Sequence, residues 1–139
     1  MGNDFWNSER LDALRAVAAE PVRVRISGAC MEPRLSDGAS VWVRSRRLYW
    51  PGDVLVIRSR LGGLVAHRLI GVYRRCGEWR WLTQADAAAR PDCAVTRREI
   101  IGKVSGGECS PEVASAPLGH RVGALVRLAR FAINRYIRA

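Results

Sequence analysis

The chain has 139 residues, which is enough for one domain with a single hydrophobic core and too few for a second core of normal size. Its apolar share of 48% is ordinary for a globular protein, but its formal net charge of +10 indicates attraction to an anionic partner. Because the arginines are scattered along the chain and the sequence has no nucleic-acid-binding motif, we expect no nucleic-acid partner and favour a membrane surface.

The four cysteines do not indicate a disulfide framework or a metal site. A domain of this length buries enough apolar surface to fold without disulfides, and no Cys-x-x-Cys pair indicates zinc, so we expect no metal and no cofactor. Residues 1–20 are polar, unlike a signal peptide, and no apolar run reaches the roughly 18 residues of a spanning helix. The sequence therefore predicts a cytoplasmic protein, at most peripheral at the inner face of the membrane.

The predicted elements are one short helix followed by several strands. Asn7 or Ser8 can cap the helix, which belongs to an N-terminal segment over residues 1–21. Apolar and basic residues then alternate over 22–26, which is typical of a half-buried strand. Further strands are predicted over residues 41–43, 54–57, 64–73, 79–83 and 99–104. Turns join successive strands, so we expect a mainly β fold, a coiled antiparallel sheet or partial barrel, over residues 22–105.

A linker and a basic amphipathic helix are predicted at the end of the chain. Residues 106–117 are rich in Gly, Ser and Pro, which is typical of a linker. Over 118–139, apolar residues recur at three- and four-residue steps and arginines lie on the other side. The apolar stripe consists of Leu118, Val122, Leu125, Val126, Ala129, Ala132, Ile133, Tyr136 and Ile137. Two alternatives remain open for it: packing on protein, either the domain itself or a second copy, and binding to an anionic membrane.

A candidate nucleophile lies in the turn sequence Gly-Ala-Cys-Met-Glu-Pro-Arg-Leu, where the cysteine is Cys30. A remote base is available in His67, one of only two histidines in the chain. A thiol is weak as a nucleophile until a neighbouring group takes its proton, and histidine is the usual base. The pair predicts an active site, while the alternative is that both residues are buried structural groups.

Four blocks in this order resemble the sequence pattern of type I signal peptidases. These are the Cys30 turn, a Gly-Asp-Val strand start at Gly52, His67 followed by Arg68, and a Thr-x-x-Asp block at Thr83. In the family the first block is Gly-x-Ser-Met-x-Pro-x-Leu and the last is Thr-x-Gly-Asp. With a histidine where most members have lysine, the chain is similar to the archaeal and endoplasmic-reticulum branch of the family. The superfamily also includes LexA-type repressors. The chain lacks a helix-turn-helix segment before the sheet, which disfavours a repressor.

The resemblance implies an endopeptidase that cleaves leader or precursor peptides at small residues. It assigns Cys30 as the nucleophile and His67 as the base, oriented by an aspartate. We assign Asp92 to His67, and Asp86 to shaping the site. The structural alternatives are a surface acid for Asp92 and a turn residue for Asp86.

The turn around the nucleophile is expected to supply the oxyanion site and support the substrate groove. The nearest donor is the backbone amide of Cys30, in a turn with Gly28 and Ala29, and Ser27 is a further candidate. The family suggests that Met31 packs beside the nucleophile, and Pro33 is expected to be a rigid turn element.

Three departures from the family pattern weaken the expectation of ordinary activity. Cys30 stands in place of serine, Ala85 in place of the glycine of Thr-x-Gly-Asp, and Ala39 in place of an acid. A site built around an alcohol and a glycine can lose its geometry with these residues. The alternative function is therefore a catalytically impaired pseudoprotease that binds peptides without cutting them.

Overall fold

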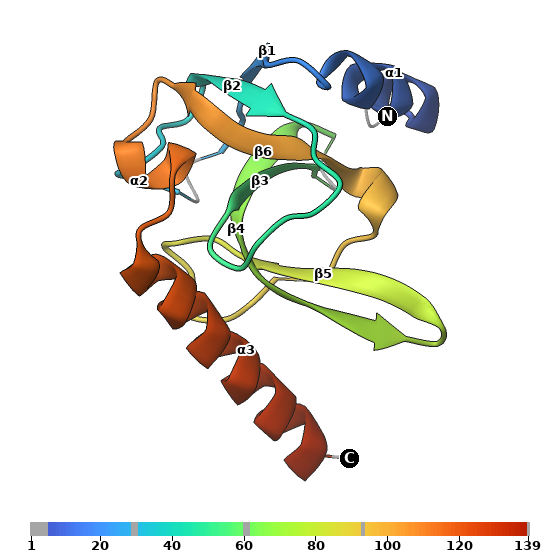
Figure 1. Ribbon diagram of the computed structural model, residues 1–139, viewed down its shortest axis with the longest axis vertical. Coiled ribbons are helices and arrows are strands. Elements are labelled where there is room, and N and C mark those ends of the chain that lie inside the picture. The colour runs from blue at the N-terminus through green and yellow to red at the C-terminus, as the bar shows by residue number, and fades with distance from the viewer. Residues whose placement is uncertain (1–5, 29–30, 60–61, 93, 139) are drawn as a thin grey trace.

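A computed structural model describes residues 6–28, 31–59, 62–92 and 94–138 (Figure 1). In this part of the chain the main element is a six-stranded sheet in which all neighbouring strands are antiparallel. The strands are β1 (Val22–Arg25), β2 (Ser40–Arg44), β3 (Val54–Arg58), β4 (Leu64–Arg75), β5 (Glu78–Gln84) and β6 (Ile100–Gly107). The predicted antiparallel, mainly β character is confirmed, and the sheet is open, with β1 and β5 at its edges.

The last strand lies in the middle of the sheet. The spatial order is β1-β2-β6-β3-β4-β5, so β6 separates β2 from β3, which follow one another in sequence. Strand β6 is buried at Ile100, Ile101 and Val104, as expected of a strand covered on both faces. Register shifts interrupt the pairing of β6 with both neighbours and of β4 with β5. Such bulges increase the local twist of a sheet, in keeping with the curvature of the strands in Figure 1.

Three α-helices and a 3₁₀ turn accompany the sheet in the described residues. They are α1 (Ser8–Val17), the 3₁₀ turn η1 (Arg97–Glu99), α2 (Pro111–Ala114) and α3 (Leu118–Ile137). The side chain of Asn7 caps α1 by accepting a 3.0 Å hydrogen bond from the amide of Arg10. Leu11 of α1 belongs to the main core, the same cluster of buried side chains that contains Val41 and Ile101.

Residues 106–117, for which composition predicts a linker, contain regular structure instead. Strand β6 continues to Gly107, and α2 follows it. The side chain of Val113 in α2 is fully buried in the main core. The amide of Ser110 donates to the carbonyl of Arg34, which holds the segment on the domain. Pro111 at the first helical position is compatible with a helix start, so a proline in this region marks a helix rather than a flexible connection.

Helix α3 packs on β4 with a face that the predicted apolar stripe does not include. Ala124 is buried against Ile70, and Leu128 and Phe131 pack beside it. A Cβ at Gly71 would lie 2.4 Å from a methyl carbon of Leu128, so a larger residue at this position would force the Leu128 side chain to move. The domain therefore leaves the stripe residues on the outer side of α3.

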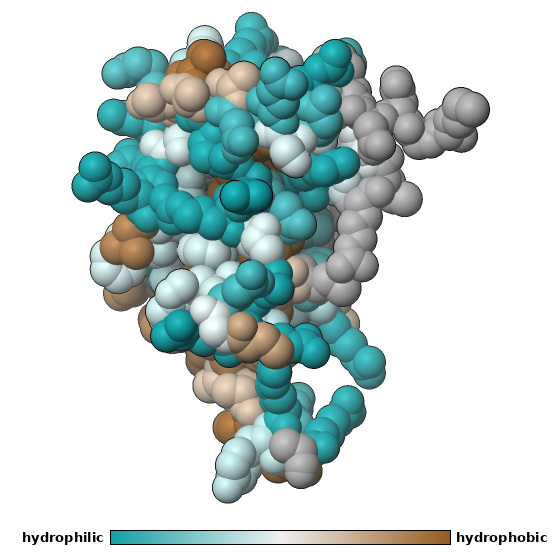
Figure 2. All heavy atoms as spheres, turned by 90° about the vertical axis from the view of Figure 1, so that its right-hand side faces the viewer, coloured by the Kyte–Doolittle hydropathy of each residue, from teal (hydrophilic) through white to brown (hydrophobic). Residues whose placement is uncertain are grey.

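An ion pair holds the first turns of α3 against the sheet. Arg121 lies 3.0 Å from the buried carboxylate of Asp53 and also donates to the carbonyl of Pro51. Asp53 accepts a second hydrogen bond from the amide of Trp50, so it closes its own turn as well as binding the helix. The face of the molecule on the right-hand side of Figure 1 is mostly hydrophilic, with small hydrophobic patches (Figure 2).

Replacing Gly102 with alanine tests how closely β6 approaches β2. A Cβ at residue 102 would lie 2.6 Å from the carbonyl oxygen of Arg44, a backbone atom that cannot rotate away. We expect Gly102→Ala to lower the free energy of unfolding by about 1–3 kcal/mol in urea titrations. Gly106→Ala on the same strand is the matched control, because its Cβ would meet Trp42 at an ordinary 3.8 Å. Equal losses in the two variants would contradict this packing.

Candidate active site

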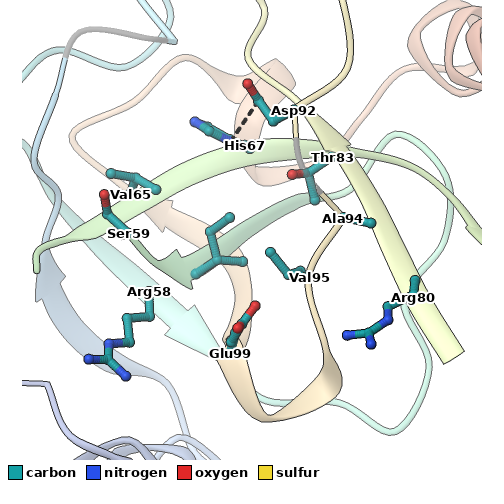
Figure 3. A pocket seen from close by; sticks show the side chains of 11 residues that line it. Arg58, Ser59, Val65, His67, Arg80, Thr83, Asp92, Ala94, Val95 and Glu99 are labelled. Atoms are coloured by element: carbon teal, nitrogen blue, oxygen red, sulfur yellow. Dashed lines mark ion pairs between the residues drawn. The ribbon is translucent and has the colours of Figure 1, made fainter. Parts of the chain in front are cut away.

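A cavity of about 570 Å³ lies along β3, β4 and β5 and contains the predicted base. His67 enters it from β4 and Thr83 from β5, and Asp92 reaches it from the loop that follows β5 (Figure 3). The remaining wall is apolar at its centre and charged at its rim. It consists of Ile57, Arg58, Ser59, Val65, Arg80, Ala94, Val95 and Glu99. The cavity is therefore a groove with polar groups converging beside an apolar surface, which is common among ligand-binding sites.

His67 and Asp92 face one another in the cavity. The Nδ1 atom of His67 lies 3.0 Å from Oδ2 of Asp92, which is close enough for an ion pair (Figure 3). The contact does not have the alignment of a hydrogen bond, because neither ring nitrogen of His67 has a hydrogen-bond partner among the described residues. Asp92 thus acts on the ring through its negative charge, as a charge–dipole contact with the neutral imidazole and as an ion pair once the ring is protonated.

Burial determines the charge state of His67. Loss of solvent around the largely buried ring lowers the pKa of His67 below its ordinary value, and the negative charge of Asp92 offsets part of this effect. The imidazole is therefore neutral near pH 7, which is the form that can accept a proton.

Asp92 is itself held in place by the backbone. Its Oδ2 atom accepts a 3.3 Å hydrogen bond from the amide of Ala85, and its own amide donates to the carbonyl of Thr83. Ala85 is not among the described residues with positive φ, so its side chain adds no backbone strain at the position where the family has glycine. Alanine at residue 85 is thus compatible with an ordered site.

Asp86 lies on the other side of β4 and binds Arg68. Two hydrogen bonds of 2.8 and 2.9 Å join the Arg68 guanidinium to the two carboxylate oxygens, and the same guanidinium donates to the carbonyl of Gly52. His67 and Arg68 are consecutive on a strand, so their side chains point to opposite faces. Asp86 accordingly supports the loop that carries Asp92, and it does not contact His67.

A second, smaller cavity of about 160 Å³ surrounds this ion pair. Arg34, His120 and Arg127 line it together with Arg68 and Asp86. Burial by itself raises the pKa of Asp86, but the hydrogen bonds and charge of Arg68, with smaller effects of Arg34 and His120, leave it below its usual range. Asp86 is therefore ionised and fully engaged as a structural counter-ion near pH 7.

The turn that contains the predicted nucleophile is described only in part. Cys30 and Ala29 lie outside the described residues, so their predicted roles remain predictions. Gly28 has a φ of 92° and its amide donates to the carboxylate of Asp37, a conformation that suits glycine. The amide of Ser27 donates to the carbonyl of Leu64, which ties the turn to β4.

The residues after Cys30 contact the loop that carries Asp92. Met31 is buried, and its sulfur accepts a 3.3 Å hydrogen bond from the amide of Asp86; its predicted packing beside Cys30 stays a prediction. The Glu32–Pro33 peptide bond is cis, and the amide of Leu35 donates to the carbonyl of Met31 across the turn.

Thr83 begins the Thr-x-x-Asp block, but the sequence assigned it no role of its own in the site. Its hydroxyl is buried in the cavity and has no hydrogen-bond partner among the described residues. A buried hydroxyl without a partner is costly, so a ligand or water in this cavity could satisfy it. The sequence signal was its position at the start of the Thr-x-x-Asp block, directly before the loop that carries both aspartates.

Neither of two comparisons with known proteins assigns a role to the residues of this site. No protein-family model matches the chain, and no curated protein matches its sequence significantly. Within the described ranges, no group of three or more His, Cys, Asp or Glu side chains could hold a metal ion.

The pKa of His67 tests its contact with Asp92. In Asp92→Asn the charge that offsets part of the burial effect is absent, so the pKa of His67 should fall further below its ordinary value. NMR titration of the ring protons, assigned with His67→Gln, measures the shift. Glu99→Gln is the control, since it removes a carboxylate that lines the same cavity without contributing to this pKa. An unchanged pKa in Asp92→Asn would show that the two side chains do not interact in solution.

Stability measurements test the structural role of Asp86. Asp86→Asn leaves the Arg68 charge buried without its counter-ion, and we expect it to lower the free energy of unfolding by about 3 kcal/mol at pH 7. Because the pKa of Asp86 is below its usual range, this stabilisation should be lost as the pH falls through the folded-state pKa. Asp12→Asn is the control, because Asp12 is 66% exposed in its 2.7 Å pair with Arg15. Similar losses in both variants would contradict a buried, structural pair.

Proposed function

We propose that the protein is a cysteine endopeptidase that resembles type I signal peptidases and uses Cys30, His67 and Asp92. The observation that carries the proposal is the contact between the largely buried ring of His67 and the exposed carboxylate of Asp92, 3.0 Å apart in a cavity of about 570 Å³. A neutral imidazole with one nitrogen facing a carboxylate and the other without a described partner has the state required of a general base.

In the proposed reaction His67 takes the thiol proton of Cys30 at Nε2. The thiolate attacks a peptide carbonyl and forms a tetrahedral intermediate, and the imidazolium then donates its proton to the departing amine. This leaves a thioester on Cys30. Water, deprotonated by His67, attacks the thioester, releases the acid and restores the thiol. The charge of Asp92 stabilises the imidazolium that forms in both halves of the reaction.

The shape of the cavity supports a peptide substrate. Apolar side chains of Ile57, Val65 and Val95 form a surface for substrate side chains, and Arg58 and Arg80 are at its border. The contact of Met31 with the loop that carries Asp92 also supports a shared site, because Met31 follows Cys30 directly. The preference for small residues in a leader or precursor peptide rests on the family resemblance alone.

Alkylation of the cysteines tests whether His67 activates Cys30. Because the thiolate is the reactive form, iodoacetamide should modify Cys30 faster than Cys76 at neutral pH, and His67→Ala should slow Cys30 alone. Cys76 is the internal control because it is exposed, whereas burial raises the pKa of Cys109. Peptide mapping by mass spectrometry gives the rates. Equal effects on Cys30 and Cys76 would contradict the dyad.

A cleavage assay then separates the endopeptidase from a pseudoprotease. With a library of peptides containing small residues, Cys30→Ala should abolish product formation and His67→Ala should lower kcat/KM by roughly 10²–10⁴-fold. Cys30→Ser should preserve or raise cleavage if the site keeps serine-peptidase geometry, and should lose cleavage if the site is adjusted to sulfur. Peptide binding without any cleavage by the unaltered protein would favour the pseudoprotease.

A further inference from the structure

Helix α3 has apolar side chains on two faces, and the domain covers only one of them. The covered face is built around Ala124, Leu128 and Phe131. The other face, here called the outer stripe, has seven large apolar side chains that are 48% to 86% exposed. They are Leu118, Val122, Leu125, Val126, Ile133, Tyr136 and Ile137. A contiguous exposed face of this kind is unusual on a protein that acts alone in water, and it indicates an interaction surface.

The charge of α3 is of one sign. The helix contains arginines and no Asp or Glu over its full length. Arg121 is paired with Asp53, and Arg135 lies over the ring of Tyr73 at 5.3 Å. Arg130 on the helix and Arg138 at its C-cap are exposed. The outer stripe is therefore bordered by positive charge that α3 itself cannot neutralise.

This charge pattern decides between the occupants of the outer stripe. A second copy of the chain would place the arginines of one α3 against those of the other, with no acidic side chain on either helix to pair with them. A transmembrane arrangement also does not fit, because no described helix is both long and apolar enough to cross a bilayer. An anionic lipid surface satisfies both features, since acyl chains take the apolar side chains and headgroups take the arginines.

We propose that α3 lies in the interface of an anionic bilayer, with the outer stripe toward the acyl chains and Arg130 and Arg138 at the headgroups. The position of α3 in the molecule permits this contact. The helix lies at the border of the structure and extends beyond the sheet to the C-terminal end (Figure 1). The outer stripe points away from the face that packs on β4, so a flat surface can reach it without displacing the helix.

Vesicle co-sedimentation of the full chain tests the proposal. The protein should bind vesicles of phosphatidylcholine mixed with phosphatidylglycerol much more strongly than phosphatidylcholine alone, and added salt should release it. Leu125→Ser combined with Ile133→Ser removes two exposed apolar side chains and should weaken binding roughly tenfold or more. Arg130→Gln combined with Arg138→Gln should have a similar effect on anionic vesicles, and none on neutral ones.

Matched controls separate these effects from general loss of charge or apolar surface. Arg23→Gln with Arg44→Gln makes the same change in net charge on β1 and β2, and Val17→Ser removes an exposed apolar side chain from α1. Both controls should bind as the unaltered protein does. Thermal midpoints should stay unchanged in all variants, because none of the substituted side chains is buried.

Three outcomes would overturn the proposal. The first is equal binding to neutral and anionic vesicles, or no binding to either. The second is unchanged binding of the outer-stripe variant. The third is a dimer of the unaltered protein in sedimentation equilibrium that the outer-stripe substitutions dissociate, which would assign this face to a second copy of the chain.

Discussion

The alternation of side chains along β4 is the constraint on which the site depends. His67 and Arg68 are neighbours in sequence, so a pleated strand sends one to the large cavity and the other to the opposite face. One loop after β5 then provides a partner for each, Asp92 for His67 and Asp86 for Arg68. A shift of one residue in register would exchange the base and the structural cation, so the site requires the observed pairing of Arg68 with Gln84.

The buried Arg68–Asp86 pair gives this loop its fixed position. A loop of exposed polar residues would place Asp92 with little accuracy, and catalytic groups need support from a second layer of contacts. Here that support is the bidentate pair, the carbonyl of Gly52 and the sulfur of Met31. The same support links the base to the turn that contains Cys30, since Met31 follows Cys30 in sequence. The proposed chemistry and the folding of this region thus depend on shared contacts.

The small number of acidic residues in this basic chain also explains the arrangement of α3. With 13 acidic against 23 basic residues, the basic side chains outnumber the carboxylates by ten. The most buried carboxylates, Asp53 and Asp86, hold Arg121 and Arg68, and these pairs fix α3 and the sheet. The surplus positive charge remains on the surface, including the exposed part of α3. A helix that is apolar and cationic on its free side is suited to an anionic interface rather than to another basic protein.

The sequence by itself determined the local features of this protein. Alternating residues and turns predicted the strands to within a few positions, and motif order singled out His67 with Asp92, because these signals act over short stretches of chain. The tertiary structure alone decided the place of β6 between β2 and β3 and the face on which α3 docks. Both depend on contacts between distant residues, such as the space that Gly71 leaves for Leu128. Composition likewise could not reveal that α2 would bury Val113, because burial depends on which surface a short segment meets.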